Sequence, residues 1–266
     1  HYEYWMTASS YLSYGGPIRV VRADDDDLKN AFAGTASDIK IKSTEHYNDL
    51  GYDGSTITGV TVVARNPGSW GNGLKVAIID DLADQVLTFS SLPSNIQVGF
   101  GITQSVPANT VVAGSGTTSL LTGFFKGIVT EVDSTNKKVS VKILESVDSA
   151  GVSTEVSYQP NGIYKFGNTG LTVRNNSGIS TGTGTPTANV DWFDSQTIQL
   201  TNSTINWNNI ADRPGTSSFA EARNSRFDEV HVVVIDDLGE VTGNAGTILE
   251  KHLSLSKAKD GEYSLG

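Results

Sequence analysis

The sequence predicts an α+β fold that is predominantly β, in which a sheet-containing core domain is interrupted by an inserted small β-barrel or β-sandwich domain. The chain of 266 residues holds 28 glycines and abundant Thr, Ser and Asn, a composition that favours strands and turns over long helices. Between two regions of β-branched runs, the pattern shifts to short alternating runs separated by polar turns. We therefore expect a discontinuous core domain of residues 1–83 and 206–266 around an inserted domain of residues 84–205.

The first elements are a helix and short extended segments. Apolar residues at helical spacing over residues 3–14 predict a helix that ends before Gly15-Gly16-Pro17. Short strands are expected at Ile18–Arg22 and, as an edge strand, at Ile39–Lys42. The four aspartates of Asp24–Asp27 lack the spacing of a calcium-binding loop, and adjacent carboxylates on an extended chain point in opposite directions. We expect a solvated acidic loop there.

The strongest local pattern runs from Val60 to Asp80, where two β-branched strands flank a loop with two bends. Pro67-Gly68 provides the first bend and Gly71-Asn72-Gly73 the second. Trp70, which lies between the bends, is expected to pack over the loop and hold its shape. The loop carries no His, Cys or carboxylate, so the pattern indicates a structural connection.

Short alternating runs across residues 84–205 predict the strands of the inserted domain. The clearest pair is a hairpin of Gly127–Val132 and Lys138–Leu144, joined by a polar turn. Further strands are expected at Gln85–Phe89, Gln97–Phe100, Val152–Tyr158 and Gln196–Leu200. Asn175–Asn189 is expected to be a long surface loop. Gly114–Ser119 is expected to be a flexible turn, because it lacks the lysine and the following helix of a phosphate-binding loop.

The last part of the chain predicts one buried strand and one ambiguous element. Phe219–Arg223 has the pattern of a helical turn, and Glu229–Ile235 has that of a buried strand. Asp236-Asp237 is expected to form an exposed turn with no reason for a shifted pKa. Ile248–Leu255 fits a strand or a short helix, and its alternation favours the strand.

Composition excludes several classes of function. The net charge of -10 argues against a nucleic-acid-binding surface, and no apolar run approaches the roughly 18 residues that cross a bilayer. There is no cysteine, and the four histidines belong to no recognised catalytic arrangement: His1, His46, His231 and His252. We therefore predict no catalytic residue, no metal site and no cofactor.

The segment Ala64–Val76 resembles a signature of the contractile tail sheath proteins of bacteriophages. Three other segments agree with that family in the same order: Gly15–Ala23, Arg213–Ser217, and His231–Asp236 followed by Gly246–Lys251. The resemblance covers roughly the first 80 and the last 60 residues, and the middle looks like a region that varies within the family.

This resemblance implies a structural subunit, not an enzyme, that forms stacked hexameric rings around the tail tube and contracts to drive the tube through the host envelope. Its partners would be copies of itself and, through other parts of the chain, tail tube and baseplate proteins, in a virion assembled in the host cytoplasm. The acidic inserted domain would face outward. The family has an N-terminal arm and a C-terminal domain that this sequence lacks, so we expect a core fragment that is monomeric alone.

The residues that carry the resemblance are assigned to shaping loops: Arg65, Asn66, Pro67, Gly68, Trp70, Gly71, Asn72, Arg213, Pro214, Gly215 and Thr216. If the arginines instead lie at subunit contacts, charge reversal at Arg213 is expected to block assembly and leave the melting temperature unchanged.

Two alternatives stay open. Thr- and Asn-rich loops with Tyr and Trp are also typical of a carbohydrate- or receptor-binding β module of a phage particle. If the chain is a sheath subunit, the sheath of a related bacterial contractile injection system is the other alternative. A hydrolase finds no support in the residue pattern.

Overall fold

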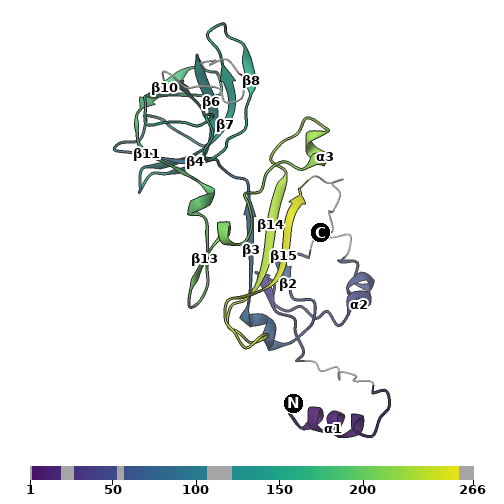
Figure 1. The fold of residues 1–266 in the computed structure, drawn as a ribbon. Coiled ribbons are helices and arrows are strands. Elements are labelled where there is room, and N and C mark those ends of the chain that lie inside the picture. The colour runs from purple at the N-terminus through teal and green to yellow at the C-terminus, as the bar shows by residue number, and fades with distance from the viewer. Residues whose placement is uncertain (1, 19–26, 53–56, 107–121, 258–266) are drawn as a thin grey trace. The chain divides into compact units, whose positions relative to one another are not determined.

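The structure is a computed structural model that describes residues 2–18, 27–52, 57–106 and 122–257 (Figure 1). It is mostly β, with 38% strand against 14% helix, which confirms the predicted predominance of strands. The chain divides into two compact units, residues 1–74 and 75–266. Each unit is described by itself below.

The described part of the first unit holds few regular elements. They are the helices α1 (Tyr2–Leu12) and α2 (Thr44–Asp49), the strands β1 (Phe32–Gly34) and β2 (Val60–Val63), and the 3-10 helix η2 (Ser69–Gly73). β1 pairs antiparallel with β2. The predicted N-terminal helix and the strand before the two-bend loop are therefore present. The predicted strand Ile18–Arg22 and most of the acidic run Asp24–Asp27 lie outside the described residues.

The predicted edge strand Ile39–Lys42 is wrong, because a buried asparagine takes the place of a partner strand. The side chain of Asn30 donates to the carbonyl oxygens of Ile41 (3.1 Å) and Ala64 (2.8 Å) and accepts from the Ile41 N–H at 2.7 Å. Asn30 also donates its own N–H to the Ile39 carbonyl at 2.9 Å. One side chain thus satisfies the backbone groups that a strand ladder would otherwise pair.

The second unit begins with a large antiparallel sheet. Its eight strands are β4 (Gln85–Phe89), β5 (Gly101–Ser105), β6 (Phe124–Asp133), β7 (Lys138–Val147), β8 (Ser153–Glu155), β9 (Leu171–Arg174), β10 (Ser180–Gly184) and β11 (Pro186–Asp191). The order is β10-β9-β5-β6-β7-β4-β11, with β8 paired to β7. The predicted hairpin is confirmed as β6–β7, whereas Gln97–Phe100 is not a strand and β5 begins just after it.

The sheet curls into a half-barrel, and its two outermost strands are consecutive in the sequence (Figure 1). Only Thr185 separates β10 from β11, so the sheet must curl to bring the end of one outermost strand next to the start of the other. The predicted long surface loop at Asn175–Asn189 is therefore wrong. The Thr- and Gly-rich segment pairs with β9 on one side and with β4 on the other, so edge pairing has overridden its loop-like composition.

Side chains fill the concave face of the half-barrel. Phe166 lies fully buried over Gly127 of β6, where an added Cβ would approach the phenyl ring to 2.7 Å. The chain around Phe166 is held by two buried glutamines. Gln85 exchanges two hydrogen bonds with the backbone of Phe166, and Gln104 bonds the backbone of Gly167 and Thr169. These side-chain amides replace strand pairing, so an irregular segment can cross a buried region with its polar groups satisfied.

A second sheet in this unit has the order β15-β14-β3. Its strands are β3 (Leu74–Asp80), β14 (Glu229–Asp236) and β15 (Thr247–Ser256), which confirms the predicted strands at both ends of the chain. Further elements are η3 (Phe193–Ser195), β12 (Thr197–Gln199), β13 (Thr204–Asn206), η4 (Trp207–Asn209) and α3 (Ser218–Glu221). Trp192, Phe193, Ile198 and Leu200 pack in one core with Val233 and Ile235 of β14.

The turn after β14 differs from its prediction. Asp236 is fully buried, not exposed. Its Oδ2 accepts hydrogen bonds from the N–H groups of Val241 (3.1 Å) and Thr242 (2.7 Å) and from the Thr242 hydroxyl. Burial pushes the pKa of Asp236 upward, but these hydrogen bonds outweigh burial and hold it below its ordinary value. The Asp236 carboxylate therefore holds the following loop in place through hydrogen bonds.

Candidate functional site: two loops and a buried charged cluster

The two-bend loop of the first unit is shaped by its glycines and its proline. Pro67 is buried, and Gly68 has φ 142°, in the region that favours glycine. The Gly68 N–H donates to the Lys29 carbonyl at 2.9 Å, and a Cβ on Gly71 would lie 2.7 Å from the Ala31 Cβ. Close approach of two backbone segments thus requires the second glycine, and a positive φ the first.

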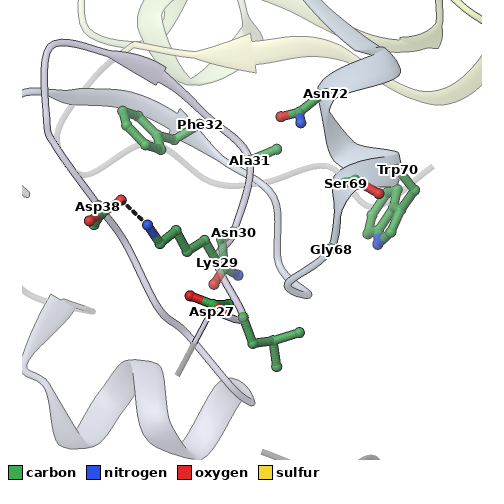
Figure 2. Close-up of a pocket in the computed structure, with 11 residues that line it drawn as sticks. Asp27, Lys29, Asn30, Ala31, Phe32, Asp38, Gly68, Ser69, Trp70 and Asn72 are labelled. Atoms are coloured by element: carbon green, nitrogen blue, oxygen red, sulfur yellow. Dashed lines mark ion pairs between the residues drawn. The ribbon is translucent and has the colours of Figure 1, made fainter. Parts of the chain in front are cut away.

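This loop lines an open pocket of about 700 Å³ in the first unit (Figure 2). Trp70 and Asn72 belong to the loop side, and Phe32 and the ion pair between Lys29 and Asp38 (3.0 Å) belong to the other. Trp70 is half-buried. Arg65 and Asn66 are exposed, and Arg65 donates to the Thr44 hydroxyl at 2.9 Å. The described lining thus combines an indole ring, a phenyl ring, side-chain amides and a charged pair.

The second loop, Arg213–Thr216, lies against the start of β14. The Gly215 N–H donates to Glu229 Oε2 at 2.8 Å, and the Thr216 hydroxyl accepts from the Phe227 N–H at 3.0 Å. Pro214 is buried. These hydrogen bonds lie within the second unit.

Arg213 is the centre of a buried cluster of charges. Its guanidinium contacts Asp191 Oδ1 at 2.5 Å and Asp84 Oδ1 at 3.4 Å, and it donates to the Ala83 carbonyl at 2.8 Å. Asp84 precedes β4, and Asp191 ends β11, so one arginine binds residues next to two neighbouring strands, the first and the last of the half-barrel in the sequence. The Tyr158 ring lies 5.0 Å from the guanidinium carbon. Arg213 therefore holds together the two points at which the chain enters and leaves the half-barrel.

A lysine completes the cluster. Lys142, in the middle of β7, forms an ion pair with Asp81 Oδ2 at 2.8 Å, and the side chains are only 7% and 3% exposed. Asp84 Oδ2 accepts the N–H of the next residue, Ile143, at 2.7 Å. The cluster holds three carboxylates, those of Asp81, Asp84 and Asp191, and two cations. It therefore carries one excess negative charge when all five groups are ionised.

Burial decides the protonation behaviour of these groups. It raises the pKa of Asp84 to about 6, although the Ile143 N–H and the two cations pull it down. Burial, followed by the charge of Asp191, raises the pKa of Tyr158. Burial lowers the pKa of Lys142, while Asp81 opposes that shift. The Asp84 carboxyl group is thus half-protonated near pH 6.

Sequence reasoning assigned Arg213 but missed Lys142, Asp81, Asp84 and Asp191. One signal was available: Lys142 interrupts an apolar strand run between Val141 and Ile143, and a lysine there needs a buried partner when both faces of the strand are covered.

Two histidines, His231 and His252, contact neighbouring groups of the fold. His231 is buried; its Nδ1 accepts the Ser254 N–H at 2.9 Å, so the neutral ring donates from Nε2 to the Asp212 carbonyl, also at 2.9 Å. His252 is exposed beside Glu250. Among the described residues, no group of three or more His, Cys, Asp or Glu side chains is placed to hold a metal ion.

Comparisons with protein-family models, with curated proteins and with solved structures give no match for this chain. No helix within the described ranges has the length and apolar character that spanning a membrane requires.

The raised pKa of Asp84 predicts a stability that falls as the pH rises. The folded protein binds the Asp84 proton up to about pH 6, whereas the unfolded chain releases it near 3.8, so unfolding releases a proton between these values. Stability from this group is complete below about pH 4 and is lost as the pH rises through 6. The shift of about two pKa units corresponds to about 3 kcal/mol.

Urea unfolding of the wild type and of Asp84→Asn between pH 4 and pH 7 measures this effect. The variant keeps an acceptor for the Ile143 N–H, and the other carboxylates titrate alike in both proteins. The difference in free energy of unfolding should shift in favour of Asp84→Asn as the pH rises. Parallel curves across this range would contradict the prediction.

Proposed function

We propose that the chain is the core part of a subunit of a contractile phage tail sheath, and that it works as a structural protein and not as an enzyme. In this proposal residues 1–83 and 206–266 form the core domain, and residues 84–205 form an inserted, outward-facing domain. Copies of the subunit form stacked hexameric rings around the tail tube, and contraction drives the tube through the host envelope.

The observation that carries the proposal is the position of the segments that resemble the sheath family. Lys75 and Val76 lie in β3, His231–Asp236 lies in β14, and Gly246–Lys251 leads into β15. These strands are neighbours in one sheet although the half-barrel strands of residues 85–191 come between them in the sequence. Parts of three of the resembling segments thus lie side by side in one sheet, and the strands of residues 85–191 belong to another sheet.

The physical mechanism would be a change in packing between identical subunits. Heterologous contacts that do not close on themselves build a helical array. Two arrangements of the same folded subunit need differ by only a few kcal/mol per copy for the sum over the array to be large. Such a subunit needs a stable body and specific surfaces, and it needs no reactive side chain.

Immunogold electron microscopy of contractile tails tests the proposal. Antibodies raised against this chain should label the whole length of the tail in particles from the source of the sequence, both extended and contracted. Labelling confined to the tail tip would instead support a receptor-binding module. Absence of label from such tails, together with label elsewhere, would contradict the sheath proposal.

A carbohydrate-binding module is the second candidate, favoured by a small pocket of about 200 Å³ on the half-barrel. Glu131, Lys138 and Trp192 are among its lining residues, a mixture of polar groups and an aromatic ring. Binding of the chain to a glycan array, lost in Glu131→Ala, would favour this candidate.

A further inference from the structure

The closest buried pair of a nucleophilic and an electrophilic side chain in the described structure is Lys142 with Asp81. The Lys142 Nζ lies 2.8 Å from Asp81 Oδ2 and also donates to the Asp81 carbonyl oxygen at 2.5 Å. Lys142 belongs to β7 of the half-barrel, and Asp81 follows β3 of the three-stranded sheet. The pair therefore connects the two sheets of the second unit.

Water has little access to this pair. The two side chains are 7% and 3% exposed, and the ring of Phe227 covers the Lys142 Nζ with its centroid 3.6 Å away. The other carboxylate oxygen, Asp81 Oδ1, is buried without a hydrogen-bond partner. A buried ion pair that leaves one oxygen unsatisfied is costly compared with a neutral, hydrogen-bonded group of the same size.

We propose that Lys142 and Asp81 condense to an intramolecular amide, a covalent bond that ties β7 to the segment after β3. This bond is independent of the proposed function, since it concerns one folded chain and no partner.

The step balances without any added reagent. The ammonium of Lys142 gives one proton to the Asp81 carboxylate, which leaves a neutral amine and a carboxylic acid. The nitrogen lone pair attacks Cγ, an N–C bond forms, and the C–O bond to the hydroxyl breaks. The amine loses a second proton, which joins the departing hydroxyl to make one water molecule.

Three features of the site favour this step. The fold holds the reacting atoms in contact, which supplies the proximity that a dilute amine and acid lack. Burial favours the neutral amine of Lys142, whose pKa it lowers, and the neutral amine is the nucleophile. The Asp84 carboxyl, with its pKa of about 6, is close enough to interact with both partners and is available for proton exchange.

The chain contains a matched pair that should not react. Lys126 and Glu145 are also in contact, at 3.0 Å, and they join the neighbouring strands β6 and β7. Their side chains are 44% and 41% exposed, so both stay hydrated. Proximity is the same, and burial is the difference.

Mass spectrometry of the denatured wild-type protein is the decisive test. We expect the intact mass to be lower than the sequence mass by one water molecule once the chain has folded, and to equal the sequence mass when the chain is kept in denaturant from synthesis onward. Trypsin should then release residues 76–126 joined to residues 139–165, with no cleavage after Lys142. Full mass in the folded protein, or free cleavage after Lys142, would overturn the proposal.

Substitutions of Asp81 and Lys142 test which side chains form the amide. Asp81→Ala and Lys142→Arg should each restore the full mass, and Asp81→Asn should lose ammonia instead of water. Lys126→Arg should leave the loss of water unchanged. Loss of water that persists in Lys142→Arg would show dehydration at another site and overturn the assignment. If these variants do not fold, the mass and the peptide map of the wild type still decide.

Discussion

Arg213→Met is expected to lower the free energy of unfolding by about 3–5 kcal/mol at pH 7, because it leaves two buried carboxylates without their cation. The guanidinium now contacts Asp191 at 2.5 Å and Asp84 at 3.4 Å, and both carboxylates are more than nine-tenths buried. Methionine keeps much of the packing of the arginine stem against Tyr158 and removes only the charge and the donors. Urea unfolding measures the loss.

The stability lost in Arg213→Met should be smaller at low pH, because the pKa of Asp84 is raised. Below about pH 5, Asp84 is mostly protonated in the fold, so one of the two uncompensated charges disappears and the cost of Arg213→Met decreases. Arg174→Met is the matched control, since Arg174 is exposed in the same unit and donates one hydrogen bond, to the Gly178 carbonyl. That control should change stability by less than about 1 kcal/mol. An equal effect of both substitutions would contradict the cluster's importance.

The contacts of Arg213 also affect how a charge reversal at this residue can be used to test assembly. Charge reversal at Arg213 would bring a third carboxylate against Asp84 and Asp191, so a lower melting temperature is expected whatever happens to subunit contacts. A substitution at an exposed arginine, such as Arg65→Glu, is therefore the cleaner probe of assembly. The Arg65 side chain donates to the Thr44 hydroxyl at the surface.

Local patterns predicted the strands whose pairing is local. The β6–β7 hairpin could be predicted because alternation on both strands and a polar turn agree, and Asp133 accepts from the N–H groups of Thr135 and Asn136 within that turn. The strands β3 and β14 were predicted from their β-branched runs, and β15 was predicted from its alternation. In each case the local preference and the tertiary environment favour the same conformation.

The sequence could not predict structure that depends on distant partners. β10 and β11 consist mainly of Thr, Gly and Asn, and they are strands because β9 and β4 offer unpaired edges. Ile39–Lys42 alternates like a strand, yet one asparagine satisfies its backbone instead. The partners within the buried cluster come from β7, from β11 and from the segment between β3 and β4, and nothing in the sequence spacing joins these segments.

Gly127→Ala is expected to destabilise the protein by about 3 kcal/mol or more, at the upper end of overpacking effects. The added Cβ would lie 2.5 Å from the Lys142 carbonyl oxygen and 2.7 Å from the Phe166 ring, both in the interior of the half-barrel. The oxygen belongs to the backbone of β7, which cannot shift without disturbing its ladders to β4 and β6. Thermal and urea unfolding of the variant measure the effect.

Gly101→Ala separates this clash from the general effect of removing a glycine from a strand. Gly101 lies in β5, paired with Ile128 of β6, and its added Cβ would meet only backbone oxygens at 3.8 and 3.9 Å. Because alanine has the lower conformational entropy in the unfolded chain, Gly101→Ala should be neutral or slightly stabilising. Phe166→Leu in the Gly127→Ala background should recover part of the loss by removing the ring contact, although the contact with the Lys142 oxygen remains. Equal stability of the two alanine variants would mean that Phe166 does not occupy the interior of the half-barrel.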